Sequence, residues 1–177
     1  MELITFTDIE TTGKLDPAHR IIELSMRVCD LNSQKELKNV LMRFNPERSI
    51  HADAFAVHGI AIEELKGKPL IATAIPSIIN VFSKSKYNVA HNGDYFDFPF
   101  IKMEVERNGF EFPEITTFDT MVNGNFATEL GKSPSLKELC WCMDVEYDPA
   151  KAHAGDYDTL VMRDAFFKAL NEGWFKL

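Results

Sequence analysis

Residues 4–13 read Ile-Thr-Phe-Thr-Asp-Ile-Glu-Thr-Thr-Gly, an apolar and β-branched run that ends in two carboxylates one residue apart. The run predicts a β-strand, and side chains at positions i and i+2 of a strand share one face, about 7 Å apart. Asp8 and Glu10 would therefore repel one another, and a folded protein keeps both ionised when a cation lies between them. The stretch favours a site for a hard metal ion, although a solvated strand end would have the same pattern.

The chain has the size of one domain with a core of its own. Its 177 residues carry a net charge of −8, and we expect a single domain over residues 1–177. The negative charge argues against a protein that coats duplex DNA or an anionic membrane non-specifically. Carboxylates that gather for metal binding make a metal-free chain look too acidic, so an enzyme that binds nucleic acid next to a metal ion is compatible with this charge.

The three cysteines, Cys29, Cys140 and Cys142, do not form the pattern of a zinc or disulfide framework. A reducing compartment is then the default expectation. No apolar run approaches the roughly 18 residues of a membrane span, and the first residues lack the basic-then-apolar pattern of a signal peptide. We expect a soluble, cytoplasmic protein that does not enter a membrane.

The early part of the chain predicts three consecutive strands. They cover residues 2–8, 20–30 and 37–44, and Asn32-Ser33 between the second and the third is typical of a turn. An antiparallel hairpin or meander is the simplest arrangement of these strands. The later part predicts helices over residues 71–82, 96–108 and 159–170 and short strands over residues 87–91 and 115–118. This order indicates an α/β fold with a mixed sheet.

Acidic residues stand in three separate places, each at the end of a predicted strand or near the start of a predicted helix. Asp8 and Glu10 close the first strand, and Asp97 begins a helix directly after a strand. Asp158 ends the run that starts at His153. Four carboxylates that converge on one spot are the ligands expected for two Mg²⁺ or Mn²⁺ ions, which take oxygen donors and keep positions open for water or phosphate.

The order and spacing of these motifs resemble the DEDDh family of 3′→5′ exonucleases, the histidine-containing subclass that includes polymerase III epsilon-like proofreading subunits, ribonuclease T-like enzymes and oligoribonucleases. The resemblance covers nearly the whole chain and implies a ribonuclease-H-like mixed β-sheet of about five strands, the first three antiparallel, flanked by α-helices. The segments that carry it are Asp8-Ile9-Glu10-Thr11-Thr12-Gly13, Arg20-Ile21-Ile22-Glu23-Leu24, Ala56-Val57-His58-Gly59-Ile60, Ala90-His91-Asn92, Phe96-Asp97-Phe98-Pro99-Phe100, Phe118-Asp119-Thr120, Ser135-Leu136-Lys137-Glu138-Leu139 and His153-x4-Asp158.

The second acidic motif departs from the family pattern. The spacing from Asn92 to Asp97 is one residue longer than in many members, and Asp94 is available as a rival ligand. The aromatic residue Phe96 directly before Asp97 favours Asp97.

The last motif also departs from the pattern. Gly155 and Thr159 stand where small alanines are usual, and Asp156 is a second candidate acid. Asp158 keeps the family spacing from the histidine. Ala154 occupies the position at which the tyrosine subclass has its tyrosine, so the histidine subclass fits better.

The resemblance implies a role for each of the acids. Asp8 would bridge two Mg²⁺ or Mn²⁺ ions, Glu10 and Asp158 would complete the shell of the first ion, and Asp97 would orient that ion or its waters. Two such ions about 3.5 to 4 Å apart supply an activated water and stabilise the leaving oxygen. His153 would take the proton of the water, since imidazole is a usable base near neutral pH.

The spacing of His153 and Asp158 sets a geometric condition. On one continuous helix a separation of five residues would place them about 140° apart, so that they could not both face the metals. We therefore expect His153 on the loop before the last helix, with Gly155 permitting the bend and Asp158 in the first turns. A mobile loop would suit a histidine that closes on substrate.

The same resemblance implies a nucleotide-binding set around the metals. The backbone near Thr12 and Gly13 would receive the terminal nucleotide, and stacking on the bases would contribute roughly 1 to 3 kcal/mol per base. The set consists of Thr11, Thr12, Gly13, Phe55, His58, Asn92 and Phe96. Such a site would prefer a frayed single-stranded end.

Other histidines and acids have simpler interpretations. We expect His91 to be structural or to position substrate, and His19 and His51 to be exposed. Glu23 and Asp119 are more typical of caps or loop partners than of catalysts.

The leading hypothesis is a two-metal-dependent 3′→5′ exonuclease that releases nucleoside 5′-monophosphates from the 3′ ends of nucleic acids, with single-stranded DNA favoured over RNA. One alternative is an exoribonuclease that trims short RNA or RNA 3′ ends, because contacts to the 2′-hydroxyl cannot be located from the residues. Another is the proofreading subunit of a DNA polymerase, and a third is a protein that binds nucleic acid without cleaving it. A DNA polymerase partner, and the choice between a monomer and a homodimer, stay open.

Overall fold

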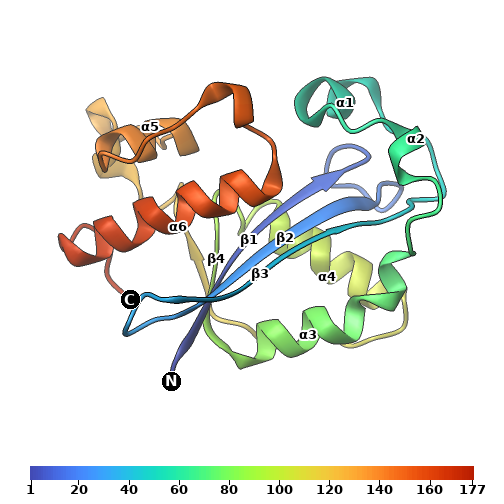
Figure 1. Ribbon diagram of the computed structural model, residues 1–177, viewed down its shortest axis with the longest axis horizontal. Helices are drawn as coiled ribbons and strands as arrows, with labels where there is room; N and C mark the ends of the chain where they lie inside the picture. The colour runs from blue at the N-terminus through green and yellow to red at the C-terminus, as the bar shows by residue number, and fades with distance from the viewer.

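Five strands form one mixed sheet in the computed structural model, which describes residues 1–177 (Figure 1). The strands lie in the order β3-β2-β1-β4-β5. β1 pairs antiparallel with β2, which pairs antiparallel with β3, while β4 runs parallel to both β1 and β5. Their bounds are Leu3–Thr11 (β1), Ile21–Asp30 (β2), Glu36–Arg43 (β3), Ser85–Ala90 (β4) and Thr117–Asp119 (β5). The prediction of a mixed sheet with three antiparallel strands first is confirmed.

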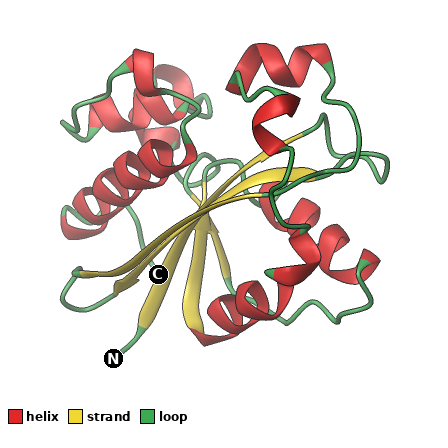
Figure 2. Ribbon diagram, turned by 45° about the vertical axis from the view of Figure 1, so that its right-hand side comes forward, coloured by secondary structure: helices red, strands yellow, loops and turns green.

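Helices cover both faces of this sheet, with α5 and α6 on one side and α3 and α4 on the other (Figure 2). The helices are Ala52–His58 (α1), Ile62–Leu65 (α2), Ile75–Lys84 (α3), Asp97–Arg107 (α4), Leu136–Cys142 (α5) and Gly155–Asn171 (α6). Short 3₁₀ turns occupy Ile71–Thr73, Asn125–Ala127, Glu129–Gly131 and Pro149–Lys151. None of the helices combines the length and the hydrophobicity that a membrane crossing requires.

Two boundaries differ from the prediction in ways that matter for the site. β1 continues beyond Asp8 to Thr11, because its pairing with β2 continues to the pair Thr11–Ile21, so both early carboxylates lie within the strand. α6 begins at Gly155 rather than at Thr159. Asp158 therefore lies in the first turn of α6.

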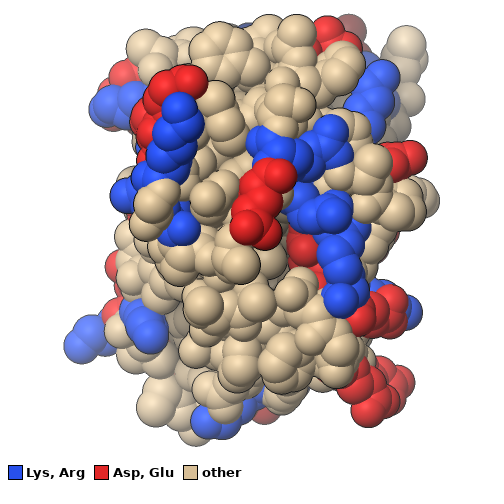
Figure 3. Space-filling view, turned by 90° about the vertical axis from the view of Figure 1, so that its right-hand side faces the viewer, with Lys and Arg blue, Asp and Glu red and all other residues tan.

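Charged side chains are unevenly spread over the surface. On the side of the molecule where α1 and α2 lie, Lys and Arg side chains gather in a band, with several acidic side chains among and below them (Figure 3). Arg20 and Arg107 both donate to the backbone carbonyls of Pro17 and His19, in the loop after β1. Basic side chains are therefore concentrated on this side although the whole chain has a net charge of −8.

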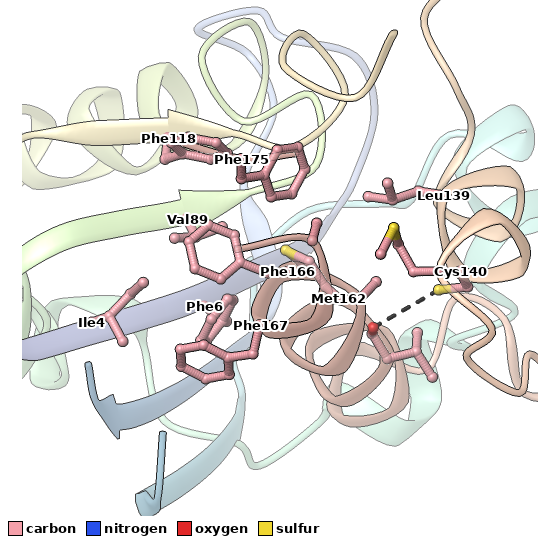
Figure 4. Close-up of a cluster of buried hydrophobic side chains, with 14 of the residues drawn as sticks. Ile4, Phe6, Val89, Phe118, Leu139, Cys140, Met162, Phe166, Phe167 and Phe175 are labelled. Carbon is pink, nitrogen blue, oxygen red and sulfur yellow. Dashed lines mark hydrogen bonds between the residues drawn. The ribbon is translucent and has the colours of Figure 1, made fainter. Parts of the chain in front are cut away.

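Five phenylalanines lie among the fifteen buried residues of the layer between the sheet and α6 (Figure 4). Phe6 of β1 contacts Phe166 and Phe167 of α6 edge to face, with ring centroids 5.3 and 5.5 Å apart. Phe118 of β5 lies 4.9 Å from Phe175 in the same way. Such pairs contribute about 0.5 to 1.5 kcal/mol each beyond the burial of their area. They fix α6 against the central strand.

A second apolar layer separates the sheet from α3 and α4. It includes Ile9 of β1, which points away from α6 because successive side chains of a strand alternate between its faces. Other members are Leu24, Met26, Ile75, Ile78, Phe82, Phe98, Phe100, Ile101 and Val105. The two layers hold β1 in the centre of the molecule.

One face of β1 changes character along its length. Ile4 and Phe6 face α6 and are fully buried, and the next two residues on this face are Asp8 and Glu10. The apolar half of the face packs against the body of α6. The acidic half lies where α6 begins.

Candidate active site

A cleft of about 550 Å³ opens at the carboxyl end of β1. It lies between the loop after β1, the helix α1, the start of α4 and the loop before α6. Its lining residues are Asp8, Ile9, Glu10, Thr11, Gly13, Lys14, His19, His51, Asp53, Ala54, Val57, His91, Asn92, Phe96, Asp97 and His153. Eight of the residues predicted from the sequence are among them: Asp8, Glu10, Thr11, Gly13, Asn92, Phe96, Asp97 and His153.

Asp97 reaches the cleft from the first residue of α4. β4 pairs with β1 only as far as Phe6, so the backbone N–H of Ile9 is free on that side of the strand. Asp97 Oδ1 accepts this N–H at 3.2 Å. The contact fixes the Asp97 carboxylate beside the backbone between Asp8 and Glu10.

Asp158 and His153 come from the start of α6 and the loop before it. His153 lies outside the helix at φ 63°, as the spacing of the two residues requires. Its backbone N–H donates to Asp158 Oδ2 at 2.8 Å. Asp158 is 6% exposed and does not line the cleft, but its charge acts on both Asp8 and Glu10.

Gly155 brings the start of α6 against the acids of the sheet. A Cβ atom at this position would lie 3.2 Å from Asp8 Oδ2, from Glu23 Oε1 and from Ser25 Cβ. The absence of a side chain therefore lets the helix approach this closely. This explains why a glycine stands at this helix start.

The acids of the site perturb one another strongly. Burial, together with the charges of Asp97, Glu10 and Asp158, raises the pKa of Asp8 well above its ordinary value. Burial and the neighbouring charges of Glu23, Asp158 and Asp97 raise the pKa of Glu10 to about 8.

The other two carboxylates are shifted in the same direction. Burial raises the pKa of Asp97 to about 7, although the N–H groups of Asp97 and Ile9 favour its charged form. Burial also raises the pKa of Asp158, against the opposing contact with His153. The four groups cannot all be ionised near neutral pH unless a cation compensates their charge.

The donor atoms fit a divalent cation by chemical type. Asp8 Oδ2 and Asp158 Oδ1 are buried and have no hydrogen-bond donor. Carboxylate oxygens are the ligands that Mg²⁺ and Mn²⁺ take in proteins. No three His, Cys, Asp or Glu side chains are arranged as a closed ligand set. The ligand shell would therefore be completed by side-chain rotation and by water or phosphate.

Two carboxylates that were rival candidates lie elsewhere. The backbone N–H of Asp94 donates to Asp119, and the Asp94 side chain is exposed and does not line the cleft. Asp156 points to Arg27, with Oδ1 2.8 Å from Nη2, and also accepts from Asn39. Neither acid is placed to join the other four.

Three residues of the predicted nucleotide-binding set do not line the cleft. Thr12 is fully buried, and its Oγ1 bonds to His19 Nδ1 at 3.1 Å and to the N–H of Arg20 at 3.0 Å. Phe55 is 47% exposed on α1. His58 is half-buried, with Nδ1 accepting from the N–H of Ile60 at 2.9 Å. Thr12 is thus a structural residue of the loop.

Gly13 lines the cleft, and its lack of a side chain also makes room for His19. A Cβ atom here would lie 2.1 Å from His19 Cε1, so the imidazole of His19 occupies the space beside the glycine. His19 is half-buried, and the prediction of an exposed residue was wrong because the loop folds it back onto Thr12. His51 is exposed, as expected, yet it lines the cleft with His19, and the two ring centroids are 6.5 Å apart. Sequence reasoning missed both as site residues.

Glu23 is neither the cap nor the loop partner that was expected. It lies within β2 directly opposite Glu10, is 2% exposed, and pairs with Arg43 Nε at 2.6 Å. The three early strands were predicted, but only the observed register of β1 against β2 places Glu23 beside the acids. Asp119 is the loop partner that was expected, since it accepts the N–H groups of Asn92, Asp94, Met121 and Val122.

His91 lines the cleft but is held by the protein itself. Its Nδ1 lies 2.9 Å from Thr120 Oγ1 and its Nε2 lies 3.1 Å from the carbonyl of Pro134. Both ring nitrogens are therefore occupied, in keeping with a structural role.

Residues 5–166 match the exonuclease family RNase_T. The chain belongs to this exonuclease family. Exonucleases of this kind use divalent metal ions, which agrees with the donor set of the cleft.

Relatives of this exonuclease include subunits and segments of bacterial replicative polymerases. It is 32% identical over 165 residues to the DNA polymerase III subunit epsilon of Rickettsia typhi. That alignment covers 90% of this chain and 70% of the Rickettsia protein. It is 29% identical over 159 residues to the PolC-type DNA polymerase III of Mycoplasmopsis pulmonis. The chain spans only 11% of the length of that polymerase.

Solved structures share the fold of this exonuclease at low sequence identity. E. coli exonuclease I in complex with a dT13 oligonucleotide aligns with a TM-score of 0.80 and 18% identity, over 97% of this chain and 41% of that one. A 3′-exonuclease that recognises the histone mRNA stem-loop aligns with a TM-score of 0.79 and 15% identity, over 97% of this chain and 64% of that one. These alignments support the assigned fold.

Proposed function

We propose that this chain is a 3′→5′ exonuclease that uses two Mg²⁺ or Mn²⁺ ions to hydrolyse the last phosphodiester bond of a single DNA strand and to release nucleoside 5′-monophosphates. The observation that carries the proposal is the gathering of four mutually repelling carboxylates from β1, α4 and α6 beside one cleft. Two of their oxygens are buried without a donor.

Asp8, Glu10, Asp97 and Asp158 would hold the metal ions. Bound there, the ions supply an activated water and neutralise the charge that develops on the phosphoryl and leaving oxygens. Asp97 is held by the N–H of Ile9, and Asp158 by the N–H of His153, so both carboxylates are oriented before metal binding. The unpartnered oxygens of Asp8 and Asp158 are left for the cations.

His153 is the general base of the proposed reaction. It lines the cleft from a loop, and its only hydrogen bond is made by its backbone N–H. A ring nitrogen is therefore free to accept the proton of the attacking water. Rotation of this loop brings the imidazole to the substrate.

Backbone N–H groups set the orientation of two imidazoles near the cleft. Nδ1 of His51 accepts the N–H of Asp53, and Nδ1 of His58 accepts the N–H of Ile60. In these two rings the hydrogen is then on Nε2. Nε2 of His58 is buried, whereas His51 lines the cleft, so that its Nε2–H is available to sugar and base oxygens of the terminal nucleotide. His19 also lines the cleft and contacts Thr12 Oγ1 through Nδ1, and burial lowers the pKa of both His19 and His58.

Contacts to the nucleotide come from the residues that bound the cleft. The backbone of Thr11 and Gly13 borders one side, and Asn92 and Phe96 border the other. Phe55 lies exposed on α1 and offers a stacking surface outside the cleft. The band of Lys and Arg side chains on this side of the molecule favours binding of a polyanion in spite of the acidic composition (Figure 3).

The similarity to these relatives supports single-stranded DNA as the substrate. The names of the curated relatives are those of DNA polymerase III subunits, and exonuclease I has been solved with a dT13 oligonucleotide. A DNA polymerase is accordingly the proposed partner, with this chain as a proofreading subunit. RNA trimming is the second candidate, because a 3′-exonuclease of a histone mRNA stem-loop shares the fold.

The test is digestion of 5′-labelled single-stranded DNA and RNA of one sequence in Mg²⁺, Mn²⁺ or EDTA. We expect a ladder that shortens from the 3′ end, requires metal, and is faster on DNA by at least about tenfold. His153→Ala should lower kcat by about 100-fold or more, because general base catalysis contributes that much. Asp8→Asn should lower kcat by about 100-fold or more as well, because it removes a proposed metal ligand. Faster digestion of RNA would overturn the choice of substrate, and no digestion of either polymer would overturn the proposed enzyme.

A further inference from the structure

Glu23, Ser25 and Arg27 point to one face of β2 and form a row of polar side chains against the first turns of α6. Ser25 Oγ lies 2.9 Å from Thr159 Oγ1. Gly155 rests against Glu23 and Ser25. Arg27, the next residue of this row, contacts Asp156. The row therefore sets where α6 begins relative to the sheet.

Arg27 makes the most extensive contact of this row. Its side chain is 5% exposed, and Nη2 donates both to the backbone carbonyl of Asp156 at 3.0 Å and to Asp156 Oδ1 at 2.8 Å. Its other terminal nitrogen, Nη1, donates to Glu36 of β3. One buried guanidinium thus joins the sheet to the first turn of α6 through a main-chain and a side-chain oxygen.

The turn that Arg27 holds carries groups of the proposed active site. Asp156 stands between His153 and Asp158, and the N–H of His153 donates to Asp158 Oδ2. A shift of the Asp156 carbonyl would move the Asp158 carboxylate and the anchor of the His153 loop together. Arg27 is too far back along β2, opposite Phe6, to face the cleft itself.

We propose that Arg27 and Asp156 form a latch that positions Asp158 and His153 for metal binding. This inference rests on the proposed function. Arg27 is a positioning residue that acts through α6, and Asp156 serves the latch instead of a metal ion. Residues that orient metal ligands from outside the coordination shell are worth about 10- to 100-fold in metal affinity.

The Arg27–Asp156 contact can be removed without leaving an unpaired buried charge. In Arg27→Met, Glu36 keeps its ion pair with Arg163, and Asp156 keeps Asn39 and water because its side chain is 49% exposed. Removal of one partner of a buried ion pair is costly when the other charge stays buried and unpaired, and neither Glu36 nor Asp156 is left in that state. The latch therefore predicts that the free energy of metal binding weakens by more than the free energy of unfolding falls.

The experiment compares wild type, Arg27→Met, Asp156→Ala and the double variant. Mn²⁺ binding is measured by calorimetry, the half-saturating Mg²⁺ concentration and KM by oligonucleotide digestion, and Tm by thermal unfolding in EDTA. We expect Mn²⁺ affinity to fall about tenfold or more in Arg27→Met, with a KM for the oligonucleotide within about twofold of wild type. Asp156→Ala should lose less, because Arg27 still holds its carbonyl. The double variant should be no worse than Arg27→Met.

Arg163→Met is the matched control. Arg163 is the other arginine of this ion-pair network and lies on α6, but it contacts Glu36 and Asp164 and not the first turn. Metal affinity should be unchanged in this variant. An equal loss in Arg163→Met, an unchanged affinity in Arg27→Met, or a further loss when Asp156→Ala is added to Arg27→Met would each overturn the latch. A wild-type protein that binds no metal would overturn both the latch and the proposed function.

Discussion

In the folded protein the carboxyl groups of Glu10 and Asp97 bind protons more tightly than in an unfolded chain. Their pKa values are about 8 and about 7, against ordinary values of 4.5 and 3.8. The folded state therefore holds protons that the unfolded state releases, and these groups favour folding most below about pH 4. Their contribution is lost as the pH rises through about 7 and 8.

This sign gives a prediction for the metal-free protein. In EDTA its Tm should fall between pH 5 and pH 8.5, and saturating Mg²⁺ should restore the Tm most strongly at the higher pH, since an ion that binds only the folded state stabilises it. Thermal unfolding over this pH range, with and without Mg²⁺, is the measurement. Glu10→Gln should flatten the fall, and a Tm that rises towards pH 8.5 in EDTA would contradict the prediction.

Individual residues differ in how far the sequence could reveal them. Asp8, Glu10 and Asp97 belong to short motifs whose local pattern is informative by itself. His19 and Glu23 could not be found in this way. The role of His19 depends on a loop that folds back onto Thr12, and that of Glu23 on the register that sets it opposite Glu10.

At the scale of the elements, the start of α6 was predicted only approximately. The spacing of apolar residues indicated a helix from Thr159, and the separation of His153 and Asp158 placed Asp158 in its first turns. In the structure the helix starts at Gly155, because the close approach to β2 and the contact of Arg27 with Asp156 favour that start. Tertiary contacts that a single chain segment does not display therefore decided the element that carries Asp158.

The loop between β4 and α4 gives a second prediction. Asp119 accepts four backbone N–H groups, two of them from the segment that precedes Asp97. Asp119→Ala leaves these donors without their acceptor and should cost at least about 2 kcal/mol of unfolding free energy. It should also lower kcat/KM, because Asn92 and Phe96 line the cleft.

Urea unfolding and oligonucleotide digestion check this prediction. Asp94→Ala is the control, since the exposed carboxylate of Asp94 makes no hydrogen bond and its loss should change neither quantity appreciably. Equal effects of the two substitutions would show that the loop is not held by Asp119.

At the scale of the whole molecule, an acidic protein is expected to bind a polyanion through a local basic region. Arg48 lies beside His19, where its charge adds to burial in lowering the pKa of that histidine, and its only hydrogen bond is to the carbonyl of Ser49. Arg48→Gln should weaken binding of long single strands and reduce the slope of log K against log salt by about one.

The salt dependence of KM for an oligonucleotide measures this contribution. Lys84→Gln is the control, because Lys84 ends α3 at the opposite end of the sheet from the cleft. An unchanged slope in Arg48→Gln, or the same change in Lys84→Gln, would contradict a local basic contact at Arg48.

The overall arrangement was predictable in part. The alternating strands and the later helices indicated a mixed α/β sheet, and the early hairpin was recognised from its turn residues. The central place of β1 was not predictable, because the parallel pairing of β1 with β4 joins segments about 80 residues apart and depends on the apolar layers on both faces.

The change along β1 from Phe6 to Asp8 also bears on how the protein folds. A slip of this strand by one residue against β2 would turn every side chain to the other face. Asp8 and Glu10 would then enter the apolar layer of α3 and α4, where unpaired charges are very costly. The acids proposed to hold the metal ions therefore also destabilise the shifted register of β1 during folding.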